Sequence, residues 1–110
     1  MQIFARKEND DLVLEIKGRI DALTSPKLEE ECQSRIDQGE KAFILDLGGV
    51  EYISSAGLRT ILILARRLNS LEGQIRFCGL HGMVEEVFSI SGFNSLFPIF
   101  PSVTEALGQS

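Results

Sequence analysis

The sequence contains little of what most catalytic and metal-binding sites require. Its 110 residues include no tryptophan, a single histidine (His81) and two cysteines (Cys32 and Cys78). A structural zinc site needs about four ligands of suitable type, so we expect no metal. A serine nucleophile needs a base within hydrogen-bond reach. We therefore expect no enzymatic activity, although a small hydrolase that pairs Ser55 with His81 stays open as an alternative.

Basic residues and long apolar runs are also scarce. Lys and Arg number 11 against 16 Asp and Glu, which gives a formal net charge of −5. Nucleic acid is not an expected partner, because binding to phosphate backbones needs a basic surface. No stretch approaches the roughly 20 apolar residues that span a bilayer. The first residues lack the order of a signal peptide, and both cysteines are expected to be free and buried. These features predict no membrane insertion and a cytoplasmic protein.

The composition is that of one ordinary globular domain covering residues 1–110. Apolar residues make up 44% and charged residues 25%, and this length suits a single core. Neither a G-x-x-x-x-G-K-[ST] nor a G-x-G-x-x-G motif is present, so no nucleotide cofactor is expected.

Alternating helical and extended patterns predict a mixed sheet. Two short strands with a polar link between them predict an antiparallel hairpin. Ser25 as N-cap and Pro26 at the first position predict the start of a helix that Gly39 ends. Strands are expected at 2–7, 12–17, 42–47, 74–78 and 96–100, and helices at 25–38, 57–69, 81–90 and 102–107. The order ββαβαβαβα predicts an α/β fold with a mixed four- or five-stranded sheet and about four helices packed on it.

The helix expected at 57–69 has an apolar and a polar side. Steps of 100° per residue place these residues on the side facing the core: Leu58, Ile61, Leu62, Ala65 and Leu68. The other side is expected to carry Arg59, Thr60, Ile63, Arg66, Arg67 and Ser70.

Two serines follow the buried strand at the point where this helix is expected to begin. Gly48 and Gly49 predict a tight turn between the strand expected at 42–47 and the two serines. A phosphate on Ser55 would be stabilised by the free N–H groups and the dipole of the helix N-terminus. The alternative is that Ser54 or Ser55 only caps the helix, a contribution of about 1 kcal/mol to stability. The residues alone leave both interpretations open.

The same segment resembles a known family. The runs 43–47 and 53–58, with Val50 between them, resemble the STAS domain of bacterial anti-sigma factor antagonists. Residues 18–21 with Thr24 resemble the family's other recurrent stretch, and the resemblance covers nearly the whole chain. It implies the STAS fold over residues 1–110, with the phosphoacceptor at Ser55 and the family's glycine at Gly57.

The resemblance also implies a function. In this family the unphosphorylated protein binds an anti-sigma factor that is also an ATP-binding serine kinase, and a PP2C-type phosphatase reverses the phosphorylation. The family commonly has Asp before the acceptor, whereas this chain has Ser54, which makes Ser54 a second candidate acceptor. A phosphorylation-independent interaction module is the alternative, either a stressosome-type scaffold or a subunit of a lipid-transport ATPase complex.

The expected partner surface surrounds the phosphoacceptor. Ile63 lies on an otherwise polar helix side and is a candidate apolar anchor. The full set of expected partner-binding residues is Asp21, Thr24, Ser54, Ser55, Gly57, Arg59, Ile63 and Arg67.

Overall fold

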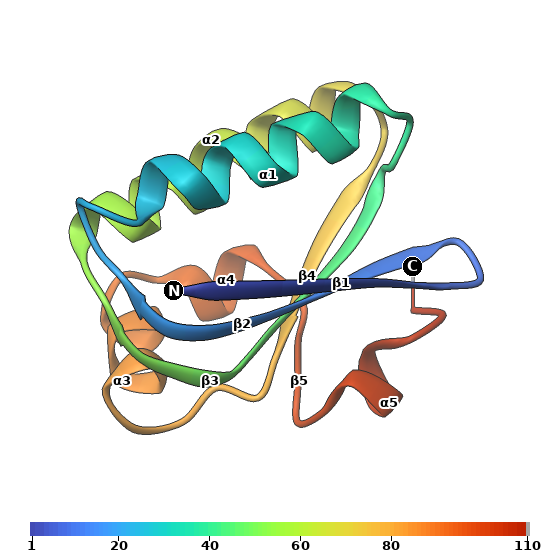
Figure 1. Ribbon diagram of the computed structural model, residues 1–110. Coiled ribbons are helices and arrows are strands. Elements are labelled where there is room, and N and C mark those ends of the chain that lie inside the picture. The colour runs from blue at the N-terminus through green and yellow to red at the C-terminus, as the bar shows by residue number, and fades with distance from the viewer. Residues whose placement is uncertain (110) are drawn as a thin grey trace.

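The computed structural model describes residues 1–109, which form a five-stranded mixed sheet and five helices (Figure 1). The expected α/β class is confirmed. The elements are β1 (Gln2–Glu8), β2 (Asp11–Ile20), α1 (Ser25–Asp37), β3 (Ala42–Ile53), α2 (Ser55–Ser70), β4 (Gln74–Cys78), α3 (Gly82–Ile90), α4 (Phe93–Leu96), β5 (Ile99–Phe100) and α5 (Val103–Ala106).

The strands lie in chain order across the sheet, β1-β2-β3-β4-β5. β1 and β2 form the expected antiparallel hairpin, in which Glu8 pairs with Asp11 and Asn9 takes a positive φ of 57° in the turn. The other three pairs are parallel. Parallel strands bring the carboxyl ends of β2 and β3 to the same edge of the sheet, where α1 and α2 begin.

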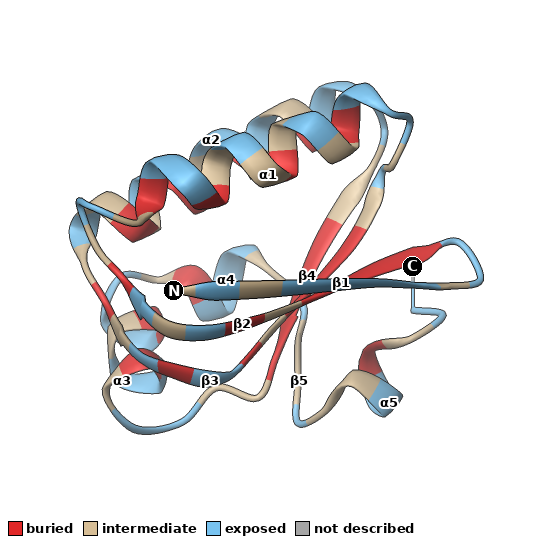
Figure 2. Cartoon of the chain, in the orientation of Figure 1, coloured by how far each residue is buried: buried red, intermediate tan, exposed pale blue. Residues whose placement is uncertain are grey.

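One face of the sheet holds the main core. Apolar side chains of the central strands pack there against α1 and α2, which lie side by side over the sheet, and against α3 and α4 (Figure 1). The inward side of α1 carries Leu28, Cys32 and Ile36, which are all buried. Figure 2 shows the buried residues of both helices on the side turned toward the sheet.

The opposite face is covered at one end by α5. A second apolar cluster joins Val13, Ile44 and Cys78 of the sheet to Ala106 of α5. Beside this cluster the buried Arg76 guanidinium donates hydrogen bonds to the Asp11 carboxylate and to the Ala106 carbonyl oxygen. The expected interpretation of Cys32 and Cys78 as free, buried residues is confirmed.

The turn expected at Gly48 and Gly49 is wrong, because β3 continues through both residues to Ile53. The ladder between β2 and β3 has irregular register beside these glycines, where the two strands come very close. A Cβ atom on Gly49 would lie 2.8 Å from Lys17 Cγ and 3.1 Å from the Ile16 carbonyl oxygen. Gly49 therefore permits a close strand contact, and the chain does not reverse at either glycine.

The remaining element differences are small in extent. α1 begins at Ser25 itself with Thr24 as N-cap, so the expected Ser25 cap is wrong by one residue. The strand expected at 96–100 is reduced to β5, and the short helix α4 precedes it. At the end of α3, Ile90 is 86% exposed although the helix is otherwise packed against the core.

The buried side of α2 is rotated from the expected one. Thr60 was placed on the polar side, but it is buried together with Ile61 and Leu64. The reason is that α2 contacts α1 as well as the sheet, so a second direction on the helix is covered. Leu58 and Leu62 are half-buried and pack against the edge of the core.

Candidate functional site

The two serines lie at the junction of β3 and α2. Ser54 is the N-cap residue in extended conformation, and Ser55 is the first residue of α2. The Ser54 N–H donates to the Ile20 carbonyl oxygen at 2.9 Å, and the Ser54 carbonyl accepts from the Leu58 N–H at 3.0 Å. The first bond joins the start of α2 to the end of β2, and the second closes the first turn of α2.

The two hydroxyl groups differ in their surroundings. Ser54 Oγ is buried and has no hydrogen-bond partner among the described residues, so it does not cap the helix. Ser55 is exposed at the first position of the helix. The first N–H groups of an α-helix have no acceptor within the helix, so donors surround the exposed Ser55 side chain.

The loop between β2 and α1 is ordered by its own side chains. Asp21 Oδ1 accepts hydrogen bonds from the N–H groups of Leu23 (3.0 Å) and Thr24 (3.1 Å). Thr24 Oγ1 accepts from the Asp21 N–H at 2.9 Å and donates to the Arg19 carbonyl oxygen at 2.8 Å. The expected site residues Asp21 and Thr24 therefore shape this loop, which leaves the sheet beside the Ser54–Ile20 bond.

The same hydrogen bonds change the acidity of Asp21. Its pKa lies below the usual value of 3.8, chiefly because the backbone N–H of Thr24 donates to the carboxylate. Burial opposes the effect, while the Leu23 N–H and the Arg19 charge add to it. Asp21 is thus held in its charged form.

The outer side of α2 continues the site away from Ser55. Arg59 is exposed four residues after Ser55 and forms no ion pair within residues 1–109, and Ile63 is 37% exposed. These residues border a hollow of about 520 Å³ that extends from Ser55 to Phe93 of α4. The structure thus brings together the expected residues Ser55, Arg59 and Ile63 on one surface.

Gly57 and Arg67, also among the expected site residues, make contacts within the fold. Gly57 is buried, and a Cβ atom there would lie 2.7 Å from Ile53 Cγ1 and 2.8 Å from Ile20 Cγ2. The Arg67 guanidinium donates hydrogen bonds to Gln33 and, at 2.6 Å, to Asp37, both on α1. Gly57 lets α2 approach the strand ends, and Arg67 joins the two helices.

The structure also shows an exposed apolar residue, Leu23, that sequence patterns did not identify as a candidate for partner binding. Leu23 is 90% exposed at the tip of the loop that Asp21 orders. Loops have no apolar periodicity, so only its position in the stretch 18–24 could have indicated it. Leu23 thus provides an exposed apolar group at the edge of the sheet where α1 begins.

His81 is engaged elsewhere. It is the N-cap residue of α3, and its Nε2 lies 2.9 Å from the Gly48 carbonyl oxygen, within β3 rather than at the end of that strand. Within residues 1–109, no cluster of three or more His, Cys, Asp or Glu side chains is arranged to hold a metal ion. None of the helices in that range is both long and apolar enough to cross a membrane.

The fold and the exposed serine at the start of α2 define a small α/β domain of the kind found in anti-sigma factor antagonists. A crystal structure from Thermotoga maritima, named as one of these, superposes with a TM-score of 0.91 at 19% identity, covering 96% of this chain and 91% of that one. The phosphorylated form of the Bacillus cell fate determinant SpoIIAA superposes with a TM-score of 0.75 at 18% identity, covering 96% of both chains.

Sequence comparison identifies the family. The STAS domain matches residues 2–106. BtrV of Bordetella bronchiseptica, whose name places it among the anti-sigma factor antagonists, is 39% identical over 99 residues, or 90% of this chain and 85% of BtrV. The chain belongs to the STAS domain family.

Proposed function

We propose that this protein is an anti-sigma factor antagonist that exchanges partners when Ser55 is phosphorylated. In the unphosphorylated form it binds an anti-sigma factor that is also an ATP-binding serine kinase. A PP2C-type phosphatase restores that form, and the cycle takes place in the cytoplasm. The name of the 39% identical relative BtrV supports the antagonist function.

The contrast between the two serines is the observation that carries the proposal. A kinase phosphorylates only an oxygen that it can contact. Ser55 is exposed, whereas Ser54 Oγ is buried. This contrast supports Ser55 as the phosphoacceptor over Ser54. The transfer moves the γ-phosphoryl group of ATP to Ser55 Oγ, the hydroxyl proton goes to a base of the kinase, and ADP leaves. The phosphatase then uses water to cleave the O–P bond and releases inorganic phosphate.

The charges of α2 explain how a phosphate would act on binding. The helix contains three arginines and no acidic residue, in a protein of net charge −5. Arg67 is paired with Asp37, which leaves Arg59 and Arg66 to attract an acidic partner surface. A phosphate on Ser55 adds about −1.5 to −2 charges and lies four residues before Arg59, so it repels that partner and also occupies Arg59.

This mechanism needs no change of fold. SpoIIAA superposes on this chain equally well in its unphosphorylated and phosphorylated forms, with TM-scores of 0.74 and 0.75. The dipole and free N–H groups at the start of α2 stabilise a dianion where it stands. The phosphate therefore acts on the surface that the partner contacts.

The first test is phosphosite mapping by mass spectrometry on the protein purified from its own cells. A phosphate on Ser55 is the expected result. An unmodified protein under all growth conditions would instead favour a constitutive interaction module, of the scaffold or transport-complex type.

The second test measures binding to the cognate anti-sigma factor. Ser55→Asp should weaken binding more than tenfold with an unchanged circular dichroism spectrum, because like charges across an interface are strongly unfavourable. Ser55→Ala should bind but resist phosphorylation, and Ser54→Ala should behave as the native protein. Equal affinity of Ser55→Asp and the native protein would contradict the proposal.

His81→Ala tests the alternative of a small hydrolase. It should change neither binding nor phosphorylation, whereas a hydrolase that uses His81 would lose its activity.

A further inference from the structure

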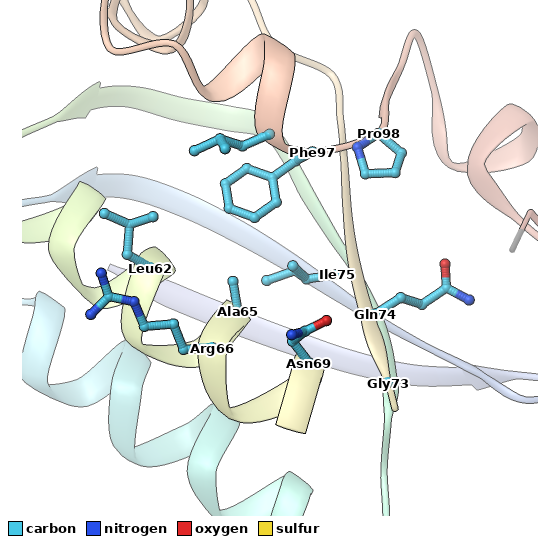
Figure 3. A pocket seen from close by; sticks show the side chains of 10 residues that line it. Leu62, Ala65, Arg66, Asn69, Gly73, Gln74, Ile75, Phe97 and Pro98 are labelled. Carbon is cyan, nitrogen blue, oxygen red and sulfur yellow. The ribbon is translucent and has the colours of Figure 1, made fainter. Parts of the chain in front are cut away.

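A second surface lies at the other end of α2. A groove of about 380 Å³ runs between the C-terminal half of α2, the beginning of β4 and the junction of α4 with β5 (Figure 3). Leu62, Ala65 and Phe97 line it with apolar side chains. Leu96, beside them, is 61% exposed. The groove thus offers an apolar hollow at the open side of the sheet edge.

The backbone of β4 is incompletely paired along this groove. The Gln74 N–H donates to the Lys41 carbonyl oxygen at 2.8 Å, on the β3 side, and the Phe77 N–H donates to the Pro98 carbonyl oxygen at 3.1 Å, on the β5 side. Since alternate residues of a strand direct their N–H and C=O groups to the same side, Ile75 directs both groups toward the β5 side.

At Ile75, however, β5 offers no partner. The ladder between β4 and β5 contains only the pairs Phe77–Ile99 and Cys78–Phe100. Pro98 comes next along the ladder, and proline has no N–H to donate to the Ile75 carbonyl. An edge strand with free N–H and C=O groups is a template for an added strand.

The groove also has a distinct charge. Arg66 is its only charged lining residue, and Arg66 forms no ion pair within residues 1–109. The amide side chains of Asn69 and Gln74 complete its polar rim. In an acidic protein, this groove is therefore a local site for a negatively charged group.

We propose that this groove binds a short extended segment of a partner protein that combines apolar with acidic residues. The segment lies beside β4 and forms main-chain hydrogen bonds with Ile75. One apolar side chain fills the hollow between Leu62, Ala65 and Phe97, and a carboxylate pairs with Arg66. The hollow near Ser55 shares Leu62 and Arg66 with this groove, so one partner can occupy both surfaces. The inference does not depend on phosphorylation of Ser55.

A random octapeptide display library, selected on the chain of 110 residues, tests the chemistry of the occupant. The expected result is enrichment of peptides that combine Asp or Glu with Leu, Ile, Val or Phe and contain no proline at the strand-pairing positions. Enrichment of basic peptides, or no enrichment, would overturn the proposal.

Variants of two arginines on the same helix locate the site. Arg66→Glu should weaken binding of a synthetic selected peptide about tenfold or more, because it replaces a charge-assisted hydrogen bond with repulsion. Arg59→Glu is the matched control, since Arg59 is exposed on α2 but does not line the groove, and it should leave peptide affinity unchanged. Equal losses for the two variants would show a general charge effect and would overturn the assignment.

Amide NMR provides a readout of strand addition. The selected peptide should slow hydrogen exchange at the Ile75 amide and shift resonances of the C-terminal half of α2, but not those of Ser55. Peptide binding without any effect at Ile75 would overturn strand addition.

Two further results would overturn the proposal, because they would show that the groove binds another occupant. One is self-association of the chain that Arg66→Glu abolishes. The other is displacement of the peptide by a fatty acid. The Ser55→Asp variant should bind the peptide as the native chain does, so failure of the phosphorylation proposal would leave this result unaffected.

Discussion

At the scale of single residues, Ser54 and Ser55 are neighbours whose hydroxyl groups lie in opposite environments. Ser54 Oγ is buried without a hydrogen-bond partner among the described residues, and Ser55 is exposed at the start of α2. A buried hydroxyl without a partner reduces stability, because it has lost its bonds to water and gained nothing in return. The energetic roles of the two residues should therefore differ as clearly as their accessibility.

Ser54→Ala tests this difference. The substitution removes an unpaired buried hydroxyl, so the free energy of unfolding should stay unchanged or rise by up to about 1 kcal/mol. Urea unfolding followed by circular dichroism measures the effect. A fall of about 1 kcal/mol would instead indicate the lost N-cap that the sequence allowed.

The Asp21 carboxylate gives a prediction about pH. Its pKa in the folded protein should lie below 3.8, because the N–H groups of Thr24 and Leu23 donate to the charged form. Asp21 therefore supports the loop fully above the unfolded-state pKa, and this support is lost as the pH falls through the folded-state pKa. An NMR titration of the Asp21 carboxyl carbon checks the direction. A pKa at or above 3.8 would contradict these bonds.

At the scale of elements, α2 shows how far the sequence predicts this protein. Its existence and its start near Ser55 follow from apolar spacing and from residues that favour a helix N-terminus. The buried side of α2 cannot be predicted from the same patterns, because Thr60 and Leu64 are covered only when α1 also packs against the helix. Likewise, the role of Arg67 depends on Asp37, which is distant in the sequence.

In the rest of the fold, too, local patterns predict the elements, whereas contacts with neighbouring elements decide the details. The first four strands and α1 have their own apolar patterns, and the structure confirms that these elements form. Gly48 and Gly49 suggest a turn in isolation, but both lie within β3, where Gly49 lets Lys17 of the neighbouring strand come close. The groove beside β4 was not predictable, since it depends on where β5 begins to pair.

Two arginines of α2 should separate stability from binding. Arg67→Ala removes hydrogen bonds to Asp37 and Gln33 on α1, so it should lower the free energy of unfolding by about 1 kcal/mol or less. It should leave affinity for the anti-sigma factor unchanged. Arg59→Ala should do the reverse, with native stability and weakened binding. Measuring urea unfolding and binding by calorimetry on both variants checks this, and loss of affinity in Arg67→Ala alone would contradict it.

At the scale of the whole molecule, a buried ion pair connects distant parts of the chain. Arg76 of β4 pairs with Asp11 at the beginning of β2, and the Asp11 Oδ2 atom accepts the Gly108 N–H at 2.8 Å. Arg76 also donates to the Ala106 carbonyl. The hairpin, the inner strand β4 and the last helix thus meet at two side chains.

This ion pair should respond non-additively to substitution. Arg76→Met alone should lower the free energy of unfolding by about 3–5 kcal/mol, because it leaves the Asp11 carboxylate buried without its partner. Arg76→Met combined with Asp11→Leu should cost less than the sum of the two single substitutions. Urea unfolding of the four proteins in the cycle measures the coupling. Additive losses would show that the two charges act independently.

The same ion pair has a consequence for synthesis of the chain. Ribosomes synthesise a protein from its N-terminus, so Asp11 emerges first, Arg76 follows later, and the acceptor at Ala106 and the donor at Gly108 emerge after both. Until α5 leaves the ribosome, the two charges have no complete set of hydrogen bonds and the second apolar cluster stays open. Folding of this domain should therefore be completed only after α5 has left the ribosome, and a nascent chain stalled before α5 should be digested by protease more readily than one from which residues 1–109 have emerged.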